Sequence, residues 1–243
     1  MSQPRIRLEA CTLLGEGRYL LDEAQAHHLT RVLRRYEGAL VEGLSGEGRV
    51  LLRLRLGAGR VEAEEVERVP ESPDLLRVVL VVALLKADQF EPLLRMAAEF
   101  GVAEIRLLAC ERSVPRLESC REEGKLSRWR RILDESTRQS GSLRPPTLHP
   151  PVLVRELEEA TLPPSRFGAF LAPGTVPLGR CLPVEAAAVA VGPEGDWSDQ
   201  EVETLRAKGF VPVGLGPRIL RASTAAAAAC GALRLSWEAR KTP

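Results

Sequence analysis

Two glycine-marked turns in the last third of the chain, each directly after a short apolar run, constrain the fold most. They are residues 192–195 (Gly-Pro-Glu-Gly) and 215–221 (Leu-Gly-Pro-Arg-Ile-Leu-Arg). The apolar runs before them are typical of buried parallel strands, and α/β proteins build ligand sites where such strands end. Neither turn matches a dinucleotide-binding or phosphate-binding loop. We therefore expect a ligand that is held by backbone groups rather than in a phosphate cradle.

The region from residue 74 to residue 243 alternates short apolar runs with amphipathic segments. This alternation predicts a mostly parallel sheet with helices on both faces. The expected strands cover 78–84, 105–109, 169–172, 187–191 and 211–215, and the expected helices cover 89–100, 122–140 and 222–237.

The first 70 residues have a different pattern. Segments 40–44, 50–56 and 61–69 alternate apolar and charged residues with a period of two and are separated by glycine-containing turns, which predicts a small antiparallel barrel or sheet. One helix is expected over 23–35. The Pro-Glu-Ser-Pro segment at 70–73 breaks the pattern, so we place a domain boundary there, between domains 1–70 and 74–243.

Composition excludes several classes of protein. The formal net charge is only +1, so any affinity for nucleic acid must come from local basic patches. Five cysteines without a C-x-x-C pair and three histidines argue against a zinc site or a disulfide framework, and we expect no metal. The chain has no 18-residue apolar stretch and no apolar core of a signal peptide near its start, so we expect a cytoplasmic protein without a membrane segment.

The order of residues in the two turns is more informative than the composition of the chain. The first turn is followed by a serine and Glu201, and the second opens an alanine-rich segment; together they resemble the RsmE family of SPOUT-class RNA methyltransferases. Weaker matches occur in order along nearly the whole chain. They include His28-Leu29, Val32-Leu33-Arg34, Lys86-Ala87-Asp88, Glu99-Phe100-Gly101-Val102 and Gln139-Ser140-Gly141.

This resemblance implies a fold and an activity. The fold would be α/β, with a SPOUT-type parallel sheet that carries a trefoil knot, preceded by a small PUA-like β-barrel domain that recognises RNA. The activity would be transfer of a methyl group from S-adenosylmethionine to N3 of a uridine in small-subunit (16S) ribosomal RNA. The partners would be that RNA, or the assembled small subunit, and a second copy of the chain that pairs through the alanine-rich last helix.

The resemblance also implies which residues hold the cofactor, because in the family the knot loops form its pocket. The alternative is that these residues form ordinary turns at strand ends. The expected cofactor contacts are Leu171, Ala172, Pro173, Gly192, Pro193, Glu194, Gly195, Leu215, Gly216, Ile219, Leu220 and Thr224.

Catalysis requires removal of the proton on uridine N3, or stabilisation of the anion that this removal leaves. Arg218 and Arg221, three residues apart at a helix entrance, are candidates to face that anion or a phosphate, unless they are solvated or ion-paired surface residues. Glu194 is a candidate proton acceptor, but a loop carboxylate can equally cap a helix. Ser223 stands where the family usually has glutamate, and Asp196 where it has a second glycine, so we hypothesise that Asp196 supplies the missing carboxylate.

Basic residues gather in two places. Residues 106–144 are rich in arginine around Trp129, whose ring either stacks on RNA or, as its spacing slightly favours, packs in the core. A second cluster lies in 31–35, next to two histidines, His27 and His28, that we expect to pack and cap the helix. The expected RNA contacts are Arg31, Arg34, Arg35, Arg112, Arg128, Arg131 and Arg144.

Two other functions fit the same residues less well. A non-catalytic protein that binds ribosomal RNA on this scaffold would explain Ser223 and Asp196, but it would not need a cofactor pocket. A nucleotide-dependent enzyme would need the phosphate-binding loop that the chain lacks. Titration with S-adenosylmethionine distinguishes the three.

Overall fold

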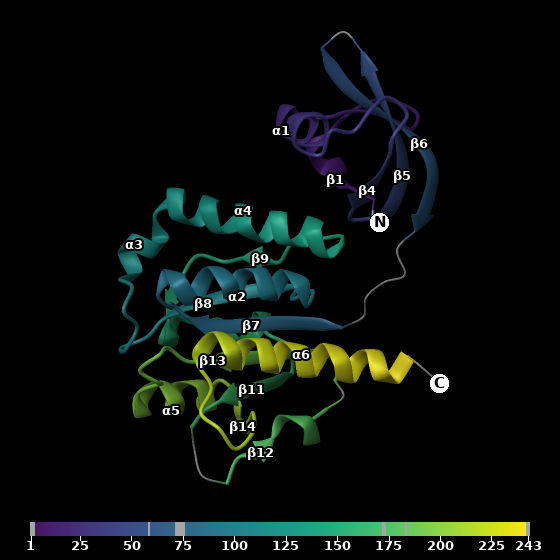
Figure 1. Ribbon diagram of the computed structural model, residues 1–243. Coiled ribbons are helices and arrows are strands. Elements are labelled where there is room, and N and C mark those ends of the chain that lie inside the picture. Colours follow the sequence, from purple (N-terminus) through teal and green to yellow (C-terminus); the bar gives the residue numbers. More distant parts are fainter. Residues whose placement is uncertain (1–2, 58, 71–75, 172–173, 183, 242–243) are drawn as a thin grey trace. The chain divides into compact units, whose positions relative to one another are not determined.

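A computed structural model describes residues 3–57, 59–70, 76–171, 174–182 and 184–241. It divides into two compact units (Figure 1). The first comprises Met1–Pro73 and Thr137–Arg144, and the second comprises Asp74–Ser136 and Pro145–Pro243. None of the described helices is both long enough and apolar enough to cross a membrane.

The first unit is built on a six-stranded sheet in the order β1-β4-β5-β6-β3-β2. The pairs are antiparallel except for β1 with β4. Val50, Leu52 and Leu54 are fully buried at alternate positions of β5, which confirms the period-two pattern. The strands are β1 Arg5–Arg7, β2 Thr12–Gly15, β3 Arg18–Leu20, β4 Leu40–Ser45, β5 Gly48–Gly57 and β6 Arg60–Pro70, and a 3-10 turn covers Leu8–Ala10.

The helix expected over 23–35 is shorter than predicted. Helix α1 (Glu23–His27) begins where the Asp22 carboxylate accepts a hydrogen bond from Gln25 N, and it continues as a π-helical turn over His28–Val32. Arg34 has a φ of 49°, which a right-handed helix cannot contain. The helix therefore ends before the arginine pair instead of including it.

Residues 137–144 fall in the first unit because arginines of its strands hold their carbonyl groups. Arg5 donates to Gln139 O at 2.5 Å, Arg49 donates to Gly141 O at 3.0 Å, and Arg7 donates to Leu143 O. Sequence pattern assigns this segment to the second domain, since bonds between distant segments leave no local signal.

The second unit contains a parallel sheet in the order β10-β8-β7-β13-β11-β14-β12, with β9 beside β8. Its central pair, β7 and β13, is in register from Arg77 with Ala186 to Val82 with Val191, and residues 78–84 are all buried. The strands are β7 Arg77–Ala83, β8 Glu104–Ala109, β9 Thr147–Leu148, β10 Val152–Leu153, β11 Ser165–Ala169, β12 Val176–Pro177, β13 Ala186–Val191 and β14 Val211–Gly214.

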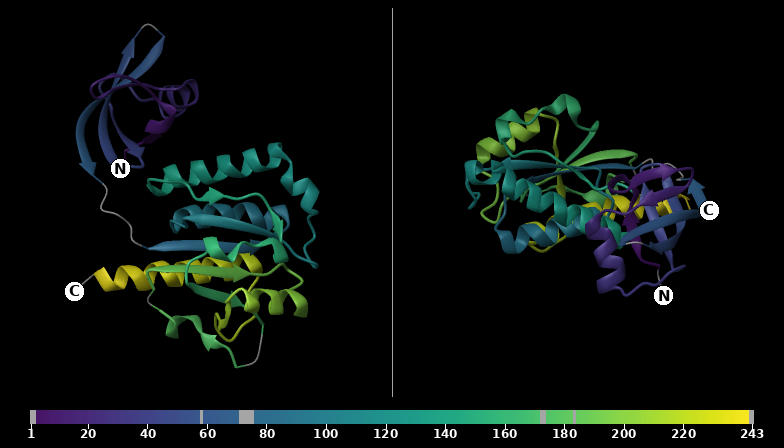
Figure 2. Two further views of the ribbon diagram at one scale, coloured as in Figure 1. Left: turned by 180° about the vertical axis from the view of Figure 1, so that it is seen from behind. Right: turned by 90° about the horizontal axis from the view of Figure 1, so that it is seen from above.

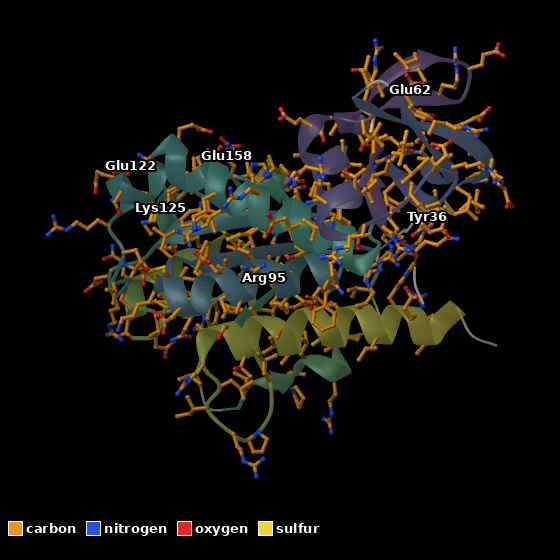
Figure 3. The ribbon with its side chains drawn as sticks, turned by 45° about the horizontal axis from the view of Figure 1, so that its top comes forward. Tyr36, Glu62, Arg95, Glu122, Lys125 and Glu158 are labelled. Carbon is orange, nitrogen blue, oxygen red and sulfur yellow. The ribbon has the colours of Figure 1, made fainter. Side chains whose placement is uncertain are left out.

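Helices α4, α2 and α6 form a row in the second unit, and α6 packs on β7 and β13 (Figures 1 and 2). Phe90 of α2 packs on Trp129 of α4 with ring centroids 4.6 Å apart, whereas Arg95 is exposed on the outer face of α2 (Figure 3). The helices are α2 Ala87–Glu99, α3 Leu117–Arg121, α4 Glu123–Ser140, α5 Asp199–Ala207 and α6 Ala222–Lys241, with 3-10 turns at Val154–Glu156, Glu159–Thr161 and Leu178–Arg180.

The strand expected at 169–172 lies earlier, at Ser165–Ala169. Its charged residue, Arg166, is tolerated because its guanidinium donates to the carbonyls of Glu159, Pro163 and Lys208. The strand ends where Phe170 N bonds Gly168 O at 2.9 Å in a tight turn. Of the expected strand, Ala169 thus ends β11, Phe170 and Leu171 follow it, and residue 172 lies outside the described residues.

Candidate active site

A cavity of about 910 Å³ lies in the second unit, where β11, β13 and β14 end and where α2 and α6 begin. This is the carboxyl edge of the parallel sheet, the usual place for a ligand in such folds. The lining residues are Lys86, Gln89, Ala169, Phe170, Leu171, Thr175, Val191, Gly192, Pro193, Glu194, Asp196, Val213, Gly214, Leu215, Gly216, Arg218, Ile219, Leu220, Arg221, Ala222 and Ala225.

The structure brings three segments expected to bind the cofactor to this one cavity. Most of the expected residues line it: Leu171, Gly192, Pro193, Glu194, Leu215, Gly216, Ile219 and Leu220. Gly195 and Thr224 are not among the lining residues, and Thr224 is exposed on α6. Ala172 and Pro173 lie outside the described residues.

Glycine is needed in the two turns for different structural reasons. A Cβ on Gly192 would lie 2.8 Å from Nε1 of Trp197, and a Cβ on Gly195 would lie 3.0 Å from Cβ of Arg112. These glycines therefore make room for neighbouring side chains. Gly216 has open space around it but a φ of 123°, so its backbone conformation requires glycine.

Trp197 braces the first turn. Its ring is 4% exposed and packs edge-on against Phe170, with centroids 6.2 Å apart and an interplanar angle of 87°. Arg112 fixes the same turn from the other side, because its guanidinium donates to Gly195 O at 3.1 Å and to Trp197 O at 3.4 Å. Arg112, expected to contact RNA, thus has a structural role in this loop.

The two kinds of predicted catalytic residue differ in their partners. Glu194 accepts a hydrogen bond from Lys86 N at 3.1 Å, and Lys86 is the residue before the first turn of α2. The carboxylate therefore holds a helix N-terminus, where negative charge is favourable. Arg218 and Arg221 are both exposed at the cavity, and no carboxylate of the described residues forms an ion pair with either.

The two departures from the family pattern have defined surroundings. Asp196 lines the cavity with a φ of 61°, a conformation that aspartate tolerates better than most residues, and its Oδ1 accepts a hydrogen bond from Trp197 N at 2.9 Å. Ser223 does not line the cavity. Its hydroxyl lies 3.4 Å from Oε1 of Gln89, which does.

Sequence reasoning missed Lys86 and Gln89 as site residues. Both follow the buried strand β7 at the carboxyl edge of the sheet, and this position is the signal that would have found them.

The other expected RNA contacts are partly engaged. Arg144 donates to Gly46 O at 2.5 Å within the first unit, and Trp129 is buried, as its spacing favoured. Arg128 pairs with Glu91 at 2.6 Å, and Arg131 lies 3.8 Å from Glu135. Both arginine side chains remain largely exposed, at 61% and 75%.

The arginine cluster of the first unit is more open. Arg31 and Arg34 are exposed, and Arg35 is half-buried, with no hydrogen-bond partner for its Nε among the described residues. Tyr36, the next residue, is 70% exposed (Figure 3). His27 and His28 are exposed in the helix. In the described part of the chain, no three His, Cys, Asp or Glu side chains gather as metal ligands would.

Comparison with known proteins identifies the family. Residues 71–234 match the RNA methyltransferase domain family. The ribosomal RNA small subunit methyltransferase E of Synechocystis is 34% identical over 224 residues, which cover 86% of this chain and 70% of the relative. That of Mycobacterium tuberculosis is 30% identical over 234 residues, with 90% and 88% covered. The chain belongs to the ribosomal RNA small subunit methyltransferase E family.

Solved structures agree with this assignment. The methyltransferase E of Neisseria gonorrhoeae, solved with bound S-adenosyl methionine, is 29% identical and superposes with a TM-score of 0.84 over 97% of this chain and 98% of its own. A methyltransferase of Legionella pneumophila in complex with the same cofactor is 24% identical, with a TM-score of 0.84, and supports the fold. The methyltransferase E family uses S-adenosylmethionine.

Proposed function

We propose that this chain transfers a methyl group from S-adenosylmethionine to N3 of a uridine in small-subunit (16S) ribosomal RNA. The observation that carries the proposal is the cavity of about 910 Å³ where three predicted loops meet beside two arginines that pair with no described carboxylate. Its volume lies in the range of about 300–1,000 Å³ that is usual for sites of small molecules and cofactors. Membership of the methyltransferase E family supports the reaction.

The residues present fit the cofactor. Apolar residues such as Leu171 and Leu215 line the cavity together with the polar residues Gln89 and Thr175, and nothing lies within 4 Å of where a Cβ on Gly216 would be, so polar and apolar parts of a ligand can be accommodated together. Bound S-adenosylmethionine would supply a methyl group on a positively charged sulfur. Under this proposal the same loops belong to the trefoil knot of SPOUT enzymes, the first unit is PUA-like, and the protein acts in the cytoplasm as a homodimer.

The side chains of the cavity would prepare the uridine. As the methyl group passed from the sulfur to N3, the proton on N3 would have to leave for a base. Arg221 and Arg218 would stabilise the negative charge that spreads onto the uridine oxygens. Glu194 and Asp196 are the carboxylates of the cavity available to accept the proton, and the bond to Lys86 N fixes where Glu194 lies.

RNA would be held outside the cavity by arginine. In the first unit the cluster of Arg31, Arg34 and Arg35 combines charge for phosphates with the exposed ring of Tyr36, on which a base can stack. In the second unit Arg128 and Arg131 present largely exposed side chains on α4.

The test is methylation with the purified protein. We would incubate it with labelled S-adenosylmethionine and small-subunit ribosomal RNA, both free and in assembled subunits, and analyse the nucleosides by mass spectrometry. The expected product is 3-methyluridine. Because a methyl on N3 blocks base pairing, a stop in reverse transcription would give its position.

Other results would lead to different conclusions. Methyl transfer to another atom would keep the enzyme class and overturn the uridine N3 assignment. Binding of S-adenosylmethionine and RNA without transfer would favour a non-catalytic RNA-binding protein, for which Ser223 and Asp196 are the motivation. Failure to bind S-adenosylmethionine would overturn the assignment of the cavity.

A further inference from the structure

A second cavity, of about 480 Å³, lies in the second unit next to the candidate active site. The two cavities share one loop: Asp196 lines the first and Ser198 lines the second, with the buried Trp197 between them. The second cavity lies where β8 and β10 end and α5 begins. Its lining includes Arg116, Leu117, Val154, Arg155, Ser198 and Gln200.

The interior of this cavity combines apolar walls with an unsatisfied polar group. Ser198 is 8% exposed, and its hydroxyl has no hydrogen-bond partner among the described residues. A buried hydroxyl without a partner costs free energy unless a ligand or water completes its bonds. Val154 and Leu117 contribute apolar surface beside it. These features suit the flat ring and polar edge of a nucleobase.

Three carboxylates and two guanidinium groups line the cavity: those of Glu111, Glu118 and Glu201, and those of Arg116 and Arg155. Glu201 is fixed inside, since its two oxygens accept hydrogen bonds from Glu111 N at 2.8 Å and Ser198 N at 2.9 Å. A free phosphate in the interior would be repelled by this carboxylate. Arg116 and Arg155 are exposed and form no ion pair with a described carboxylate, so they can receive a phosphate outside.

We propose that the second cavity binds a nucleotide of the RNA substrate next to the target uridine. Its base would enter beside Ser198 and Gln200, and its phosphate would lie on Arg116 and Arg155. This inference rests on the proposed function. Enzymes that modify a base take it out of its stack, and single-stranded RNA is recognised through splayed bases. A cavity one loop away from the methyl donor is placed to take the neighbouring base.

The first test fills the cavity with a bulky side chain. Gln200 is exposed at the start of α5 and lines the cavity, so Gln200→Trp should block it without disturbing the core. Glu203→Trp is the matched control, because Glu203 is exposed on the same helix and does not line the cavity. We expect kcat/KM for RNA to fall about tenfold or more in Gln200→Trp alone, as the removal of one bound base predicts.

A matched charge pair tests the phosphate contact. Arg155→Ala should weaken RNA binding, whereas Arg95→Ala, which removes an exposed arginine of α2 that lines neither cavity, should not. Affinity for S-adenosylmethionine should be unchanged in all four variants. If the wild-type protein neither binds the cofactor nor methylates RNA, the proposed function fails; if it does both and Gln200→Trp matches Glu203→Trp, only the second site fails.

Crosslinking locates the nucleotide directly. Substrate RNA carrying 4-thiouridine in place of part of its uridine would be irradiated with the wild-type protein, and the crosslinked peptides mapped. Crosslinks to residues 110–118 or 198–204 would support the proposal. Crosslinks that map only elsewhere would overturn it, as would saturation of the cavity by free uridine monophosphate at micromolar concentration, which would assign it to a free nucleotide.

Discussion

Arg221 and Glu194 lie on the same cavity but differ in what already holds them. Arg221 has no ion-pair partner in the described part of the chain, so its charge is available to a ligand. Glu194 accepts a hydrogen bond from Lys86 N at 3.1 Å, and this bond holds its carboxylate in place whether or not a ligand is bound. The two residues should respond differently to substitution.

Arg221→Ala should lower the single-turnover rate of methyl transfer by about a hundredfold, as the removal of one electrostatic interaction from a transition state does. Cofactor affinity should change far less. Arg206→Ala, on the exposed side of α5, is the control. An unchanged rate with weaker RNA binding would mean that Arg221 only holds phosphate.

Glu194→Gln separates a proton acceptor from a positioning residue. Glutamine can still accept the hydrogen bond from Lys86 N, but it cannot take a proton. If Glu194 is the base, the rate should fall by about a hundredfold or more at every pH and lose its acid limb. If the carboxylate only holds α2, the rate and its pH profile should stay near those of the wild type.

Sequence predicts which residues have a structural or functional role better than it predicts which residues they contact in the fold. Gly192 and Gly195 were expected to contact the cofactor; Gly192 lines the cavity and Gly195 does not, and a Cβ on either would meet Trp197 or Arg112. Arg112 and Arg144 were expected to contact RNA, but both donate to backbone carbonyls of nearby loops. Such roles depend on contacts between distant segments, which a single sequence does not display.

At the scale of elements, a charged cluster fixes the amino end of the parallel sheet. Glu104, at the start of β8, contacts Arg77 at 2.5 Å, Arg106 at 2.8 Å and His149 at 3.0 Å. Partial burial alone would raise the pKa of Glu104, but the arginines outweigh it and lower the pKa below its usual value. Burial and the charge of Arg106 lower the pKa of His149.

Both shifts make the second unit less stable in acid. The unfolded chain takes up a proton at His149 below about pH 6.5 and at Glu104 below about pH 4.3, in each case before the folded chain does. Stability should therefore be full at neutral pH and fall in these two steps. Urea unfolding followed by tryptophan fluorescence would report it, because Trp129, Trp197 and Trp237 all lie in the second unit.

Glu104→Gln identifies the source of the lower step. It should destabilise the second unit by about 1–3 kcal/mol at pH 7, since it removes charged hydrogen bonds, and should flatten the loss of stability below about pH 5. His149→Asn should flatten only the step nearer neutral pH. An acid transition that is the same in both variants and in the wild type would contradict the assignment.

Long elements were predicted well and short ones were not. The strands β5, β7 and β13 carry clear periodic or continuous apolar patterns, whereas β9, β10 and β12 have two residues each and no period. Helix α5 had a usable signal, because Ser198 and Glu201 have the spacing of a capping box and Glu201 Oε2 accepts from Ser198 N. The expected strand at 169–172 was wrong because Arg166 interrupts the apolar pattern of the true one.

For the whole molecule, we predict a homodimer that pairs through α6. Ala225, Ala226 and Ala229 of this helix are buried in the core of their own chain, so the pairing surface would be its other side, where Leu235 is 69% exposed. Light scattering should give about twice the chain mass of 26.6 kDa at micromolar concentration. Leu235→Glu should shift the mass toward one chain, and a wild-type monomer would rule out the pairing.

We predict separate roles for the two units: the first binds RNA, and the second binds the cofactor. Replacing Arg31, Arg34 and Arg35 by glutamine should weaken RNA binding across sequences and reduce the slope of its salt dependence by about 0.7–0.9 for each phosphate that is no longer neutralised. Cofactor affinity should stay the same, because the cavity lies in the second unit. A change in cofactor affinity, or an unchanged salt dependence, would contradict this division.

The central pairing of β7 with β13 has a consequence for how the chain is made. Arg77 pairs with Ala186, roughly a hundred residues later, so the core of the second unit cannot close until most of the protein has left the ribosome. Strands β4, β5 and β6 are neighbours along the chain and can pair much earlier. During translation the apolar strand β7 therefore stays unpaired until β13 has been made. Its exposed apolar surface favours aggregation in this interval, so this is when we expect the nascent chain to depend most on chaperones.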